Sequence, residues 1–152
     1  MTEARLRKIP ADRVGAREFL VQARIFMRDA RVEKVSNEGR QVLLHQTAIC
    51  ACDAILLAAG LQVTVGDRAH LLRLEHALEQ LPDDAEELLD TLDASRARRV
   101  EASYRAGPVP DASVEEAETA TADLLERAER FVGRPMPAAD AQAKTDAADT
   151  SA

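Results

Sequence analysis

The chain has 152 residues, of which 46% are hydrophobic but only 3% aromatic, with no tryptophan. This length suits one domain and a tail, and the core of such a domain must be built from Leu, Val, Ile and Ala. The formal net charge of −7 excludes recognition of a polyanion through the overall field, so contact with nucleic acid needs a local basic patch.

Residues 1–11 are a short basic lead-in that contains Pro10 and lacks the apolar stretch of a signal peptide. From Asp12 to about Arg31 apolar residues recur at helical spacing, which predicts an amphipathic helix with Asp12 at its start. We find no segment with the alternation of a β-strand. The chain is therefore expected to be built from helices.

The most apolar segment of the chain is the next predicted helix, residues 37–59. Its wide apolar surface predicts a central helix, packed on more than one side, and Gly60 is expected to end it in the left-handed conformation. The apolar run 43–61 is interrupted by His45 and Asp53 and is interpreted as too short and too polar to span a bilayer. We therefore expect no membrane segment and a cytoplasmic location.

Two cysteines, Cys50 and Cys52, lie in this helix about 200° apart around its axis. They cannot easily bridge one another or share a metal ion, so we interpret them as small core residues. The chain has no other cysteine, and it carries no metal-ligand motif and no phosphate-binding glycine loop. We therefore predict no metal site and no cofactor.

Three more helices follow in the sequence. A short one covers residues 66–81. A long one, capped by Asp83 and Asp84, runs to about Arg105. The last is expected over Val114–Val132, with Ser113 and Glu116 as a capping box. The predicted fold class is all-α: an up-and-down four-helix bundle with one extra short helix.

These elements divide the chain into three parts. Residues 1–11 are the lead-in, residues 12–133 form the bundle, and residues 134–152 form a tail. The tail is made mainly of Pro, Ala, Asp and Thr and cannot bury enough apolar surface to order itself. It is therefore expected to be disordered.

One basic side chain breaks the leucine pattern of the long helix 83–105. Arg99 lies within roughly 60° of Leu88 and Leu92 around the axis, and a core-facing arginine needs a partner or a route to water. Arg96 and Tyr104 belong to the same segment. Either these arginines are scaffold residues near a helix C-terminus, or Arg99 holds a phosphate that Tyr104 orients, or Tyr104 stacks on a base.

The three histidines do not form a catalytic set by their spacing. His45 is either a polar residue at the edge of the core or a site residue that faces the helix with Arg99. His70 and His76 are about 240° apart on the short helix. Both are expected at the surface.

The order of these elements over residues 12–132 resembles the HEPN superfamily (higher eukaryotes and prokaryotes nucleotide-binding). Three segments carry the resemblance: the apolar helix from His45 to Gly60, the motif His70-Leu71-Leu72, and Arg99–Tyr104 followed by Gly107-Pro108.

In the ribonuclease branch of that family, an arginine and a histidine on the long helix meet their copies across a homodimer interface and cleave RNA without metal. Here Arg99 matches the arginine, and Tyr104 stands where the histidine would be. An unperturbed tyrosine, with a pKa near 10, is a poor general base. The resemblance therefore implies a module with little or no catalysis.

Such a module would bind a nucleotide, RNA or a partner protein, in a toxin–antitoxin or defence context. The resemblance implies a homodimer, and a nucleotidyltransferase or a cognate toxin or antitoxin as partner. The predicted ligand-binding residues are Arg99, Tyr104, His45 and Arg96.

Two alternatives stay open. One is a metal-independent ribonuclease toxin, in which Arg99 stabilises the developing charge on phosphorus and Tyr104 or His45 transfers the proton. The other is a structural or adaptor bundle, in which Arg99 is a core ion pair.

Overall fold

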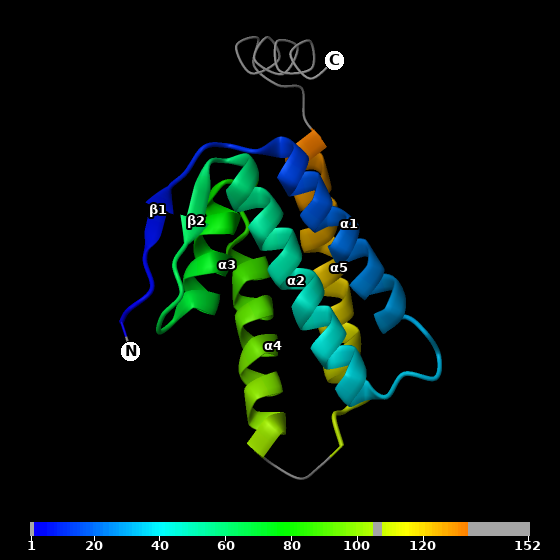
Figure 1. Cartoon of the computed structure of the whole chain (residues 1–152). Coiled ribbons are helices and arrows are strands. Elements are labelled where there is room, and N and C mark those ends of the chain that lie inside the picture. The colour runs from blue at the N-terminus through cyan, green and yellow to red at the C-terminus, as the bar shows by residue number, and fades with distance from the viewer. Residues whose placement is uncertain (1, 105–107, 134–152) are drawn as a thin grey trace.

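A computed structural model describes residues 2–104 and 108–133 of the chain, with the side chains of residues 98–104 left out of the description. The described part is an all-α helical bundle with a two-stranded sheet at one end (Figure 1). In chain order its elements are β1 (Leu6–Lys8), α1 (Arg13–Ala30), α2 (Asn37–Ala58), β2 (Leu61–Val63), α3 (Ala69–Glu79), α4 (Glu86–Tyr104) and α5 (Asp111–Gly133).

The predicted fold class is confirmed. The long helices α1, α2, α4 and α5 alternate in direction, and α3 is the short extra helix (Figure 1). The likeness to the HEPN fold stays a prediction. The predicted tail, residues 134–152, lies outside the described residues.

Local sequence signals set the ends of the first two helices. The side chain of Asp12 accepts a hydrogen bond from the backbone N of Gly15, and Ser36 does the same for Gly39 at 3.1 Å. These N-caps satisfy backbone donors that the helix cannot pair. Gly60 follows α2 with a φ of 75°, as expected for a residue that ends a helix.

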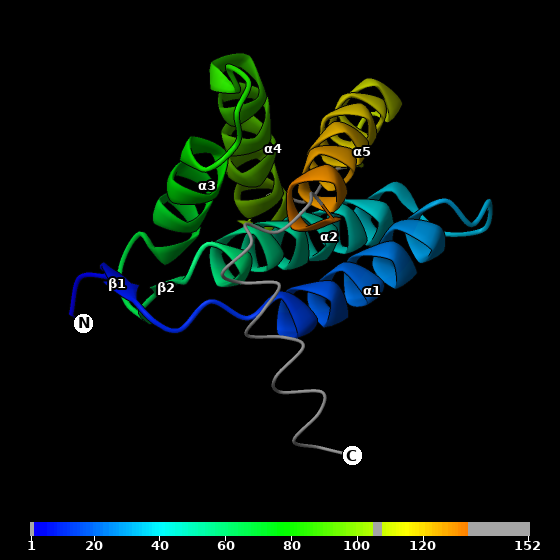
Figure 2. The same cartoon turned by 90° about the horizontal axis from the view of Figure 1, so that it is seen from above.

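Helix α2 is the centre of the bundle and packs against α1, α3, α4 and α5. Seen from above, α1 lies on one side of α2, and α3, α4 and α5 lie on the other (Figure 2). By length and composition alone α2 could cross a membrane, contrary to the sequence-based expectation, and half of its most apolar window is buried in the bundle. Contact with four helices accounts for this apolar character without a bilayer.

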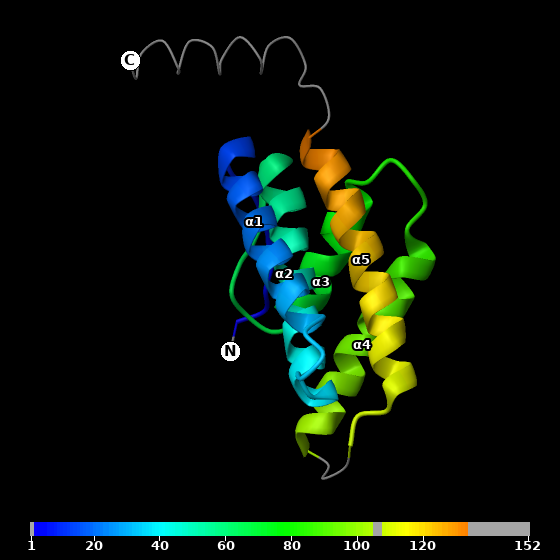
Figure 3. The ribbon, with the colours of Figure 1, turned by 90° about the vertical axis from the view of Figure 1, so that its right-hand side faces the viewer.

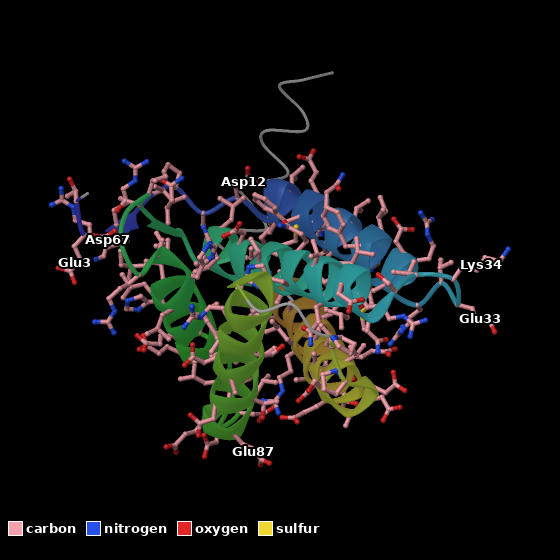
Figure 4. The ribbon with its side chains drawn as sticks, turned by 90° about the horizontal axis from the view of Figure 1, so that it is seen from below. Glu3, Asp12, Glu33, Lys34, Asp67 and Glu87 are labelled. Atoms are coloured by element: carbon pink, nitrogen blue, oxygen red, sulfur yellow. The ribbon has the colours of Figure 1, made fainter. Side chains whose placement is uncertain are left out.

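The lead-in contains a strand that the sequence did not indicate. β1 pairs antiparallel with β2, with Leu6 opposite Val63, and the side chain of Arg7 donates to Gln62 Oε1 at 2.6 Å. A further bridge joins Glu3 and Asp67, which lie together at one end of the molecule, whereas Glu33 and Lys34 lie at the other (Figure 4). Strands of three residues are too short to show an alternating pattern.

The start of α5 differs from the prediction. α5 begins at Asp111, because the backbone N of Ser113 and that of Val114 both donate to the carbonyl of Pro110. The predicted capping box of Ser113 and Glu116 is therefore wrong. α4 begins at Glu86, whose backbone N donates to the side chain of Asp84 at 3.0 Å, so one of the two aspartates predicted to cap this helix does so.

Candidate functional site

A pocket opens where α2, α3, α4 and α5 meet, and no residue of α1 lines it among the described residues. Figure 3 shows α1 and α2 on one side of the molecule and α4 and α5 on the other. The lining residues are Gln41, Leu44, His45, Ala48, Ile49, Cys52, His70, Arg73, Leu74, Leu92, Ser95, Arg96 and Thr121. The space between them is about 50 Å³, enough for a few water molecules.

Two histidine side chains meet in this pocket from different helices. His45 on α2 and His70 on α3 have ring centroids 5.5 Å apart, with the ring planes 61° from parallel. His45 is half-buried and His70 is exposed. The prediction that His70 lies at the surface is confirmed, whereas His76 is half-buried and lies 3.1 Å from Glu79.

Arg73, one of the residues that line the pocket, forms an ion pair that joins α3 to α2. Arg73 Nε donates to Asp53 Oδ1 at 2.9 Å, and Arg73 Nη1 lies 3.3 Å from Nδ1 of His70. Burial raises the pKa of the Asp53 carboxyl, and the charge of Arg73 opposes that rise. The guanidinium of Arg73 thus stabilises the negative charge of Asp53 against the effect of burial.

Helix α4 contributes Arg96 to the opposite wall. Its Nε donates to Asp93 Oδ1 at 3.1 Å, one turn earlier on the same helix, and Arg96 and Ser95 both line the pocket. Of the four predicted ligand residues, His45 and Arg96 therefore share one pocket. α4 also carries Arg99 and Tyr104, whose side chains lie outside the described residues.

Sequence reasoning missed several groups at this site. The sequence does not indicate His70 as a ligand residue, nor does it indicate Arg73 with its partner Asp53, or the buried Gln41 and Thr121. One signal was present, because an aspartate inside the most apolar helix of a bundle needs a counterion. Which arginine supplies it could not be read from spacing, since 20 residues and a helix reversal separate Asp53 from Arg73.

The floor of the pocket is apolar and includes Cys52. Burial raises the pKa of the Cys52 thiol to about 12, and burial also raises that of Cys50. Both thiols are free, and Cys52 stays protonated near neutral pH and so is a weak nucleophile. In the described part of the chain, no group of three His, Cys, Asp or Glu side chains could hold a metal ion.

No family model matches the chain, and neither a curated protein nor a solved structure matches it. The HEPN resemblance therefore rests on the sequence alone. What the pocket itself offers is a small apolar floor with imidazole and guanidinium groups around it. Such donors suit a planar or anionic group that carries several acceptor oxygens.

Proposed function

We propose that the chain binds a phosphate-bearing ligand, a nucleotide or an RNA end, in the pocket between α2, α3 and α4. The observation that carries this proposal is the meeting of His45, His70, Arg73 and Arg96 around one opening. Each arginine is already held by an aspartate, so little side-chain freedom is lost on binding. A guanidinium has five N–H donors, and the ion pairs leave some of them for a ligand.

The size of the pocket limits what enters it. A space of about 50 Å³ accommodates a terminal phosphate or the edge of a base, while the rest of a nucleotide stays outside. α4 carries Arg99 three residues beyond Arg96, a rise of about 4.5 Å along the helix axis. Arg99 and Tyr104 are therefore proposed to contact the outer part of the ligand.

Calorimetric titration of the protein with AMP and with a short 5′-phosphorylated RNA tests this proposal. We expect saturable binding that Arg73→Gln and Arg96→Gln each weaken at least about tenfold, the loss of one charge-assisted hydrogen bond. Arg24→Gln is the control, because Arg24 pairs with Glu129 on another face. Absence of binding, or equal binding by all four proteins, would contradict the proposal.

The HEPN resemblance supports a toxin–antitoxin or defence context for this binding, in the cytoplasm and with a cognate protein or a nucleotidyltransferase as partner. Expression of the chain in cells with and without the protein encoded beside its gene, scored for growth and RNA integrity, tests that context. Equal growth and intact RNA in both arms would remove the support for it.

One observation favours a second candidate, metal-independent RNA cleavage. His45 and His70 lie close enough to act on one ligand from two sides, and a pair of imidazoles can serve as general base and general acid. Purified protein would then cleave RNA in EDTA, and His45→Gln would abolish cleavage while His76→Gln would not. No cleavage by the unaltered protein would eliminate this candidate.

A further inference from the structure

The outward face of α1 carries an apolar stripe with one acid and one base in it. Val14 and Val21 are 55% and 50% exposed, and Ile25, one turn beyond Val21, is half-buried. Glu18 and Arg28 occupy the remaining positions of the stripe and are exposed. Isolated exposed valines are ordinary, whereas apolar residues that share one outward helix face with an acid and a base need an explanation.

The spacing of the stripe is that of a helix that packs against another helix. The positions 14, 18, 21, 25 and 28 of α1 follow one another in steps of four and three, the period of a coiled-coil seam. This face points away from the bundle, because α1 buries the opposite set Ala16, Leu20, Ala23, Met27 and Ala30. The stripe is therefore a second seam that no described residue covers.

The order of residues along the stripe is self-complementary when reversed. A two-fold axis on the outward face of α1, level with position 23, places Val21 opposite Ile25 of the partner. The same axis places Glu18 opposite Arg28 of the partner, on both sides of the centre. Glu18 makes no ion pair with any residue that the structure describes, and Arg28 Nε is 3.5 Å from its chain neighbour Asp29.

We infer that a second copy of this chain docks on α1, with the two α1 helices antiparallel and two Glu18–Arg28 ion pairs flanking a centre of Val21 and Ile25. Such an isologous contact is the commonest kind in symmetric dimers. A lipid surface fits this face less well, since Glu18 in the middle of the stripe would enter the apolar layer without a partner.

This interface is independent of the proposed function. The pocket is lined from α2, α3, α4 and α5, and α1 lies beyond α2 from α3 and α4 (Figure 2). The dimer therefore leaves both pockets open and brings no residue of one copy to the pocket of the other.

Sedimentation equilibrium of the full chain and of charge-reversed variants tests the inference. We expect the unaltered chain to dimerise, and Glu18→Arg or Arg28→Glu alone to weaken the dimer at least about a hundredfold, because each places like charges opposite one another twice. An equimolar mixture of these two variants restores both pairs and is expected to dimerise to within about tenfold of the unaltered chain. Glu126→Arg, an exposed position on α5, is the control and should not change assembly.

Each other outcome overturns the inference. A monomeric unaltered chain removes the interface, and single variants that dimerise as tightly as the unaltered chain place the contact elsewhere. A mixture of single variants that stays monomeric rules out the antiparallel pairing. Circular dichroism of every variant confirms that the bundle is still folded.

Discussion

Arg73 Nε lies 2.9 Å from Asp53 Oδ1, so one ion pair joins α3 to α2 at the wall of the pocket. The two side chains are 21% and 28% exposed, so water and salt screen this ion pair less than they screen a pair at the surface. Arg73, a cation of the proposed site, is thus already paired with the carboxylate of Asp53. An incoming phosphate must share Arg73 with that carboxylate.

Because a phosphate and Asp53 compete for Arg73, a substitution that removes the charge of Asp53 is expected to raise ligand affinity. Asp53→Asn removes the resident negative charge and leaves the guanidinium to the ligand, so affinity for AMP should rise several-fold, whereas Arg73→Gln lowers it. Calorimetry at neutral pH measures both, and thermal unfolding checks that the variants are folded. A fall in affinity in Asp53→Asn would mean that the aspartate itself holds the ligand or the shape of the pocket.

The buried thiol of Cys52 gives a prediction about alkaline pH. Its pKa is raised from 9.0 to about 12, so the unfolded chain releases this proton first. Stability from the protonated thiol is complete below about pH 9 and is lost as pH rises towards 12. Above about pH 9 the free energy of unfolding should fall by up to about 1.4 kcal/mol per pH unit from this group.

Urea denaturation between about pH 8 and about pH 10.5 measures this slope. Cys52→Ala should flatten it, and Cys50→Ala should flatten it less, because Cys50 is only half-buried. If the slope of Cys52→Ala equals that of the unaltered chain, the thiol is not the group that titrates.

Gly60 is expected to be intolerant of a side chain. Its φ is 75°, and an added Cβ would lie 2.9 Å from the carbonyl oxygen of Ile9. We predict that Gly60→Ala destabilises the protein by about 1–3 kcal/mol. Gly133→Ala is the matched control, since nothing lies within 4 Å of its added Cβ. An equal unfolding midpoint for the two variants would contradict the geometry of the α2–β2 turn.

Arg13 is expected to stabilise the end of α5. It is buried, and its Nη1 donates to the backbone carbonyl of Val132 at 2.7 Å, where a cation also suits the helix dipole. Arg13→Met should cost about 1.5–3 kcal/mol of unfolding free energy. Arg17→Met, at an exposed position of the same helix, should change it by less than about 0.5 kcal/mol. Equal urea midpoints for the two variants would show that the bond contributes nothing.

Sequence reasoning succeeded where the determinant of structure is local. Asp12 and Gly60 set helix ends through contacts with neighbours in the chain, and the sequence predicts both. It failed at the start of α5, where Asn37 also donates to the Val109 carbonyl and to Asp111 across more than 70 residues. No pattern in the sequence around residue 111 indicates a contact with Asn37.

The same difference between local and long-range determinants applies to the candidate site. The sequence names Arg96, from the basic segment of α4, and His45, on the helix expected at the centre, as ligand residues. The arginine on the leucine line is Arg99, whose side chain lies outside the described residues. Arg96 and His45 do line one pocket. The contribution of α3 was not recognisable, because the position of His70 and Arg73 beside α2 depends on how the chain reverses after Gly60.

The most direct test of the proposed site is a nuclear magnetic resonance titration that follows the imidazole signals of the three histidines as AMP is added. His45 and His70 line the pocket, and His76 does not and lies beside Glu79 instead. The account predicts saturating shifts of the His45 and His70 signals with one dissociation constant, while the His76 signals stay in place. Unmoved signals at His45 and His70, or equal movement of all three, would contradict it.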